Sequence, residues 1–123
     1  MTGAWGLLLI AGLAMAACSP PGPKSFDAMS GEEHLACAVD ISAYTYLLAA
    51  GKVPEDTEMA GQAALALAWH HNAYAIPLGG DESETAGVIN RKRSELIASD
   101  EPEAIAARAR VCVASAIAKN AAG

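Results

Sequence analysis

Residues 30–51, SGEEHLACAVDISAYTYLLAAG, carry the clearest fold signal in the chain. Ser30 and Glu33 have the spacing of a capping box, in which each side chain accepts a hydrogen bond from the other residue's backbone amide at the start of a helix. Gly51 supplies a stop signal, because glycine tolerates the left-handed conformation that ends many helices. Between these signals, apolar and small residues follow helical spacing. The expected inward face consists of His34, Cys37, Ala38, Ile41, Tyr44, Thr45 and Leu48.

Three more helices are expected downstream, each marked by its own start and stop signals. Pro54 fits the first turn of the second helix, and Pro77 followed by Gly79 ends it. Asp81 can cap the third helix, and Pro102 fits the first turn of the fourth. The sequence therefore continues as a series of helices joined by short turns.

No segment of useful length alternates between apolar and polar residues, as a strand would. The sequence therefore predicts an all-α fold, a small antiparallel four-helix bundle over residues 30–119, with a C-terminal tail at residues 120–123. Alanine dominates this region and has the highest helix propensity, but it buries little apolar area. A domain of this size and composition should need a further source of stability.

Cys37 and Cys112 supply that stability if they form a disulfide. Cys37 is expected about seven residues into the first helix, and Cys112 about seven residues before the end of the fourth. In an up-down-up-down bundle the first and last helices are antiparallel neighbours, so the two cysteines should lie at the same height. We therefore expect a Cys37–Cys112 disulfide between helix one and helix four, with two buried reduced thiols as the alternative.

The N-terminal segment, residues 1–17, has the features of a signal peptide. Residues 5–17 are apolar or glycine throughout, and no charged side chain precedes Lys24. This run is shorter than the roughly 20 residues that span a bilayer, but it fits the apolar region of a secretory signal. We expect an exported protein, with a retained N-terminal anchor as the alternative.

Met15-Ala16-Ala17-Cys18 resembles the lipobox of bacterial lipoproteins, in which the cysteine becomes the lipidated first residue. The resemblance implies acylation of Cys18 and attachment to the membrane, and Ser19 after it implies the outer membrane. Lipidation of Cys18 also explains the odd number of cysteines, because it leaves two cysteines that can form a disulfide with each other. Cleavage at an A-x-A site over residues 14–16 is the alternative, and it would release a soluble periplasmic protein.

Residues 18–29 are expected to form a tether between the lipidated cysteine and the bundle. Pro20, Pro21 and Pro23 disfavour a helix and favour an extended, solvated chain. Such a spacer suits a domain that is held at a membrane surface.

Charge and motifs exclude several classes of function. The formal net charge is −6, and every charged residue follows the leader, which argues against a nucleic-acid partner. The chain has no nucleophile elbow, no glycine-rich phosphate loop and no metal or haem signature. We therefore expect no catalytic residues, no metal and no cofactor.

A candidate ligand groove between the first two helices consists of Tyr44, Trp69, His70 and Tyr74, with Tyr46 beside it. The ordinary interpretation is that these side chains are part of an amphipathic core. We expect a non-enzymatic bacterial envelope lipoprotein, a small helical interaction or structural module that contacts another envelope protein. The alternative is a helical bundle that binds a small apolar ligand in the groove.

Overall fold

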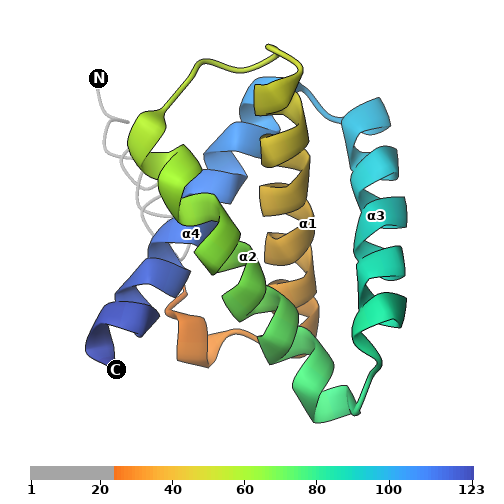
Figure 1. The fold of residues 1–123 in the computed structure, drawn as a ribbon, viewed down its shortest axis with the longest axis vertical. Coiled ribbons are helices and arrows are strands. Elements are labelled where there is room, and N and C mark those ends of the chain that lie inside the picture. The colour runs from red at the N-terminus through yellow and green to blue at the C-terminus, as the bar shows by residue number, and fades with distance from the viewer. Residues whose placement is uncertain (1–23) are drawn as a thin grey trace, which may run out of the picture.

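A computed structural model of the chain describes residues 24–123, which fold into four α-helices preceded by one short 3-10 turn (Figure 1). The turn η3 spans Phe26–Ala28, and the helices are α1 (Gly31–Ala49), α2 (Thr57–Leu78), α3 (Glu82–Ser99) and α4 (Pro102–Ala122). No β-strand occurs between residues 24 and 123. The prediction of an all-α, four-helix fold is confirmed.

Both ends of α1 follow the sequence signals. The Ser30 hydroxyl accepts a hydrogen bond from the Glu33 amide at 3.2 Å, and the Glu33 carboxylate accepts one from the Ser30 amide at 3.0 Å. At the other end, Gly51 has φ +72°, and the Lys52 amide donates to the Leu47 carbonyl at 2.9 Å. This six-to-one hydrogen bond with a left-handed glycine is a Schellman motif, which satisfies carbonyls left free at the helix end.

The start of α2 differs from the prediction, whereas the start of α4 agrees with it. Asp56 caps α2 by accepting a hydrogen bond from the Met59 amide at 3.1 Å, so Pro54 precedes the helix instead of lying in its first turn. An aspartate is a strong capping residue, and here it decides where the helix begins. Pro102 is the first residue of α4, as expected, and α4 continues to Ala122, past the predicted boundary at residue 119.

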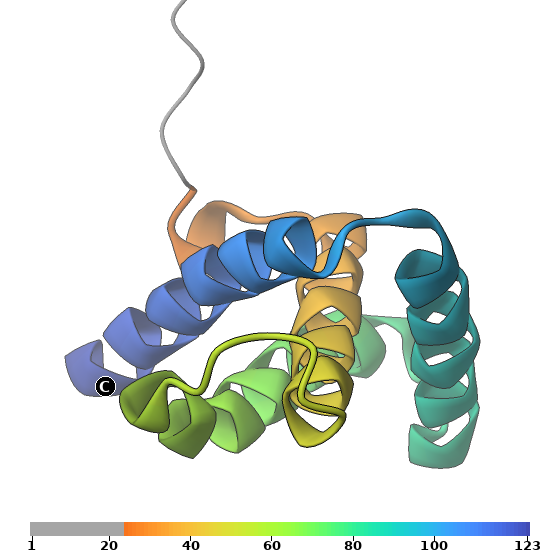
Figure 2. The ribbon, with the colours of Figure 1, turned by 90° about the horizontal axis from the view of Figure 1, so that it is seen from above.

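Helix α1 lies in the middle of the molecule, with α2 and α4 on one side and α3 on the other (Figures 1 and 2). Successive helices run in opposite directions, as a bundle of this kind requires (Figure 1). Helix α2 also packs against α4, whereas α3 packs mainly against α1. Because three helices surround α1, its side chains are buried on nearly every face, including the charged Asp40 and the polar Ser42. Thr45, expected on the inward face, is exposed.

The main hydrophobic core lies between α1, α2 and α4, and a smaller cluster joins α1 to α3. Alanine side chains allow the helices to approach closely at these contacts, at the cost of little buried area per residue. Fully buried alanines occur on three helices: Ala38, Ala43, Ala66, Ala109 and Ala116.

A disulfide links Cys37 on α1 to Cys112 on α4, with the two Cα atoms 5.4 Å apart. It closes a sequence separation of 75 residues and lies within the main core. The predicted bridge between helix one and helix four is confirmed.

Candidate functional site

The predicted site residues lie in several different environments. Cys18, the predicted lipidation site, lies outside the described residues, as does the leader that precedes it. Tyr44 is buried in the main core, whereas Tyr46 is exposed. Trp69 packs against the main core, and Tyr74 packs against the smaller cluster between α1 and α3.

Trp69 and Tyr74 point to different sides of α2 because five residues advance a helix by roughly 140° beyond one full turn. Trp69 lines a shallow hollow on the outer face of α2, and Tyr44 lines a separate hollow between α1 and α2. The four residues of the candidate groove therefore do not share one surface. What the structure brings together instead is His70 with a histidine from another helix.

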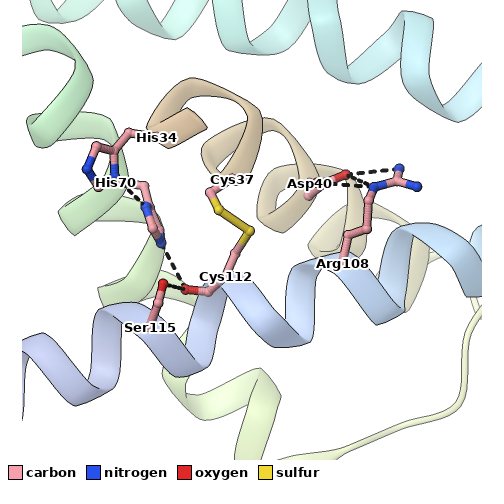
Figure 3. Close-up of a disulfide and its surroundings, with 7 residues drawn as sticks. All are labelled: His34, Cys37, Asp40, His70, Arg108, Cys112 and Ser115. Carbon is pink, nitrogen blue, oxygen red and sulfur yellow. Dashed lines mark hydrogen bonds and ion pairs between the residues drawn. A yellow bond between two sulfur atoms is a disulfide. The ribbon is translucent and has the colours of Figure 1, made fainter. Parts of the chain in front are cut away.

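His34 on α1 and His70 on α2 form a hydrogen-bonded pair in the core (Figure 3). Their Nδ1 atoms lie 2.9 Å apart, and the residues are only 5% and 0% exposed. The Nε2 atom of His70 lies 2.8 Å from the carbonyl oxygen of Cys112 on α4, which also accepts a hydrogen bond from Ser115 Oγ. The pair therefore connects three helices beside the disulfide.

The geometry fixes where the protons of a neutral pair must lie. The Cys112 carbonyl can only accept, so Nε2 of His70 must carry a hydrogen and donate it. In a neutral imidazole the other nitrogen is then a bare acceptor, so His70 Nδ1 must accept from His34 Nδ1. His34 is consequently the Nδ1–H tautomer, and its Nε2 carries a lone pair.

Phe26, the single phenylalanine of the chain, covers both imidazoles from the turn η3. Its ring centroid lies 4.5 Å from that of His34 and 5.0 Å from that of His70. Trp69 meets Phe26 edge-to-face at 5.7 Å. Residues 24–29, the end of the segment predicted to be a solvated tether, therefore pack onto the bundle.

Burial lowers the pKa of both histidines below the ordinary value, because a charged imidazole loses hydration in the core. For His34, the nearby Glu33 and Asp27 carboxylates and the Phe26 backbone oppose this effect. For His70, the hydrogen bond to Cys112 opposes it, whereas His34 itself adds to it.

A second polar contact lies at the edge of the core, between the buried Asp40 on α1 and the solvent-exposed Arg108 on α4 (Figure 3). The guanidinium lies 3.1 Å from the Asp40 carboxylate and 2.9 Å from that of Asp100. Burial raises the pKa of Asp40 more than Arg108 lowers it, and the same pairing raises the pKa of Arg108. This ion pair holds α1 and α4 together on the far side of the disulfide from the histidines.

The outer face of α2 presents apolar side chains to solvent. Leu65 and Ile76 are 43% and 72% exposed, and they flank a hollow of about 580 Å³ that Trp69, Pro77 and Phe26 also line. A second hollow, of about 560 Å³, lies between residues 24–27 and the exposed face of α4. Phe26 lines both.

The described residues contain no group of three or more histidine, cysteine or acidic side chains placed to hold a metal ion. Among residues 24–123, no helix has both the length and the hydrophobicity to span a bilayer. What the arrangement does offer is a buried pair of proton acceptors, and next to it an exposed apolar face.

Sequence reasoning missed the contact between His34 and His70, which lie 36 residues apart. The available signal was that His34 falls on the expected inward face of its helix and His70 among the residues of the expected groove or core. No protein family, curated protein or solved structure matches this chain.

Proposed function

We propose that this protein is an exported, non-enzymatic lipoprotein of the bacterial envelope whose helical domain binds another envelope protein. The lipobox-like Met15-Ala16-Ala17-Cys18 supports the anchor, and the apolar run before it supports export. The domain would be held near the membrane through acyl chains on Cys18, with residues 19–23 as a short connection.

The observation that carries the binding proposal is the exposed apolar face of α2. Leu65, Trp69 and Ile76 recur along this face at helical spacing around one hollow. Contiguous apolar surface is unusual on a monomeric protein and marks interaction sites, whereas single exposed apolar residues need no explanation. A partly buried tryptophan beside a hollow is also the kind of anchor that dominates binding energy at protein interfaces.

The partner surface that fits this face is an apolar segment of a protein. The hollow is lined almost entirely by apolar side chains, with Asn72 as its one polar side chain. The acidic charge of the domain is distributed elsewhere, so the face itself offers little to a charged partner.

A photo-crosslinking residue at position 68, within the α2 face, tests this proposal in cells that export the full chain. A captured envelope protein is identified by mass spectrometry, and its affinity for the full chain is then measured with purified components. We expect Ile76→Asp to weaken binding at least about tenfold, because a charge would have to be buried at the interface.

Tyr46→Asp is the matched control, because Tyr46 is 54% exposed on α1 and lines a different hollow. It should leave the affinity unchanged. Equal effects of the two substitutions, with both variants folded by circular dichroism, would contradict a binding role for the α2 face. The anchor is tested separately by the intact mass of the membrane-fraction protein, which should show acyl chains that Cys18→Ser removes.

A small apolar ligand is the second candidate, because the hollow beside Trp69 has a volume within the range of small-molecule sites. Native mass spectrometry of freshly purified protein distinguishes the two candidates. A retained small molecule that Trp69→Ala releases would favour the ligand, whereas protein capture that depends on Ile76 would favour the partner.

A further inference from the structure

Residues 24–29, which we call the strap, cover the buried histidine pair. The strap contains the turn η3 and packs against α4 through that turn. Its one large buried side chain is Phe26, whose ring lies over both imidazoles. The two imidazoles, which are 5% and 0% exposed as residues, therefore gain hydration if the strap moves or if the helices separate.

The strap is attached to the bundle by the side chains of Phe26 and Met29, which pack against the main core, and by two ion pairs. Lys24 pairs with Glu33 on α1 at 3.0 Å, and Asp27 pairs with Lys119 on α4 at 3.0 Å. Both are surface ion pairs, which contribute little to stability and are screened by salt. Phe26, with a smaller contribution from the partly buried Met29, thus provides most of the attachment.

Burial opposes an added proton in the closed pair. The first added proton can enter at His34 Nε2 and leave the hydrogen bond between the two Nδ1 atoms intact, whereas a second proton, on His70 Nδ1, would face the hydrogen of His34 Nδ1 across 2.9 Å and replace that bond by repulsion. The first proton leaves an imidazolium on His34 that is almost fully buried beneath Phe26, where the Phe26 backbone offsets only part of the lost hydration. Either way, the charged pair gains hydration if the strap leaves.

The charged and titratable groups around the pair come from each element packed against it. The turn η3 brings Asp27, α1 brings Glu33, α4 brings Lys119, and α2 brings His71 beside His70. The two carboxylates and the Phe26 backbone favour a charged His34, but each carboxylate is already paired with a lysine. Burial outweighs them, and the pKa of each histidine is lowered.

The helices around the pair are joined more firmly than the strap is. The Cys37–Cys112 disulfide ties α1 to α4, and α2 packs against both helices through the main core. Separation of the helices would expose the whole of that core, whereas release of the strap exposes Phe26, Met29, the imidazoles and only the part of the core that the strap covers. Strap release is therefore the less costly way to hydrate the charged pair.

We propose that the strap is an acid-released cover: protonation of the His34–His70 pair displaces Phe26 while the disulfide-linked helices stay folded. Displacement would also join the two hollows that Phe26 lines, and so enlarge the apolar surface between α2 and α4. This inference rests on the buried pair and its cover, so it holds or fails independently of the proposed envelope partner.

The test uses Trp69, which contacts Phe26, as the reporter. Trp5→Phe in the full chain leaves Trp69 as the single tryptophan. We expect acrylamide quenching of Trp69 to rise at least about twofold between about pH 7.5 and about pH 5, across the range in which histidines titrate. Over the same range, hydrogen exchange should accelerate at residues 24–29 and stay slow in the middle of α1 and α4.

Two further variants assign the change to the pair. His34→Asn with His70→Gln keeps amide donors near both positions but removes both titrating groups, so the rise in quenching should disappear. His71→Gln removes the neighbouring histidine and should leave the rise unchanged.

The proposal is overturned if quenching stays constant down to about pH 5 in folded protein, or if the double variant shows the same rise. The proposal is equally overturned if hydrogen exchange accelerates in the strap and in the helices over the same pH range. Should the double variant not fold, NMR of the unsubstituted chain decides: the ring signals of His34, His70 and Phe26 must shift with one common midpoint, and separate midpoints would overturn the proposal.

Discussion

The Nδ1 atoms of His34 and His70 lie 2.9 Å apart where α1, α2 and α4 meet beneath Phe26. A buried polar contact of this kind contributes little net stability compared with an apolar pair, because its members must be desolvated. Its energetic signature is instead a dependence on pH, because each ring can take up a proton that the folded core disfavours.

Stability should fall with acidification. Burial lowers the pKa of His34 and His70 in the folded state, whereas the unfolded chain keeps values near the ordinary 6.5. Above about pH 6.5 both histidines are neutral in the folded and in the unfolded chain, so their protonation does not reduce the free energy of unfolding. As the pH falls from there through the lower folded pKa, the unfolded chain binds more protons, and stability is lost by at most about 1.4 kcal/mol per pH unit for each histidine.

Urea unfolding at a series of pH values measures this slope. Asp40 acts in the opposite direction, because burial raises its pKa in the folded state. The His34→Asn/His70→Gln variant therefore isolates the histidine contribution and should show a flatter profile than the unsubstituted chain, whereas His71→Gln should keep the original slope. A double variant as acid-sensitive as the original would contradict the assignment.

Loss of the disulfide should destabilise the fold strongly. Closing 75 residues in the unfolded chain corresponds to about 4.5 kcal/mol in the chain-entropy model, a large share of the stability of a small domain. Cys37→Ala with Cys112→Ala should lower the free energy of unfolding in urea by an amount of this order. Cys18→Ser is the control, since it removes the third cysteine and keeps the bridge. A loss of unfolding free energy below about 1 kcal/mol would show that the Cys37–Cys112 disulfide contributes little to stability.

Arg108→Ala should cost about 2 kcal/mol at neutral pH, because it leaves the buried carboxylate of Asp40 without its guanidinium. Adding Asp40→Asn should recover part of this loss, since no buried charge then remains. Arg110→Ala is the matched control on the same helix. Its ion pair with Asp56 is longer, at 3.4 Å, and solvent-exposed, so its loss should stay below about 1 kcal/mol in thermal or urea unfolding. Equal losses of unfolding free energy in Arg108→Ala and Arg110→Ala would contradict the claim that the Asp40–Arg108 pair matters more than the Asp56–Arg110 pair.

Tyr44→Phe should leave stability unchanged or raise it by up to about 1 kcal/mol. The Tyr44 hydroxyl is buried and has no hydrogen-bond partner among the described residues, so its removal relieves an unsatisfied polar group. Tyr44→Ala, which removes the ring as well, should instead cost about 3–5 kcal/mol. A marked loss of thermal stability in Tyr44→Phe would mean that the hydroxyl has a partner after all.

Local signals were sufficient for much of the fold. The capping box at Ser30 and Glu33, the left-handed Gly51 and the leading Pro102 each act within one helical turn, so the sequence places these boundaries correctly. The Cys37–Cys112 bridge was also predictable, because alternating helix directions bring the first and last helices side by side.

The central position of α1 was not predictable from spacing. A periodic pattern marks one apolar face, but Asp40 and Ser42 are buried on others because α3 and α4 happen to cover them. The strap was missed for a related reason. Prolines before residue 24 favour an extended chain, and nothing local indicates that Phe26 turns back onto two histidines.

The protonation states of the two imidazoles test the central claim most directly. Nitrogen-15 NMR of the histidine rings at about pH 7.5 reports which nitrogen of each ring carries hydrogen. The structure requires His70 to be protonated at Nε2 and His34 at Nδ1, with a coupling across the hydrogen bond between their Nδ1 atoms. Two Nε2–H tautomers, or two rings in fast exchange with water, would show that the buried pair does not exist.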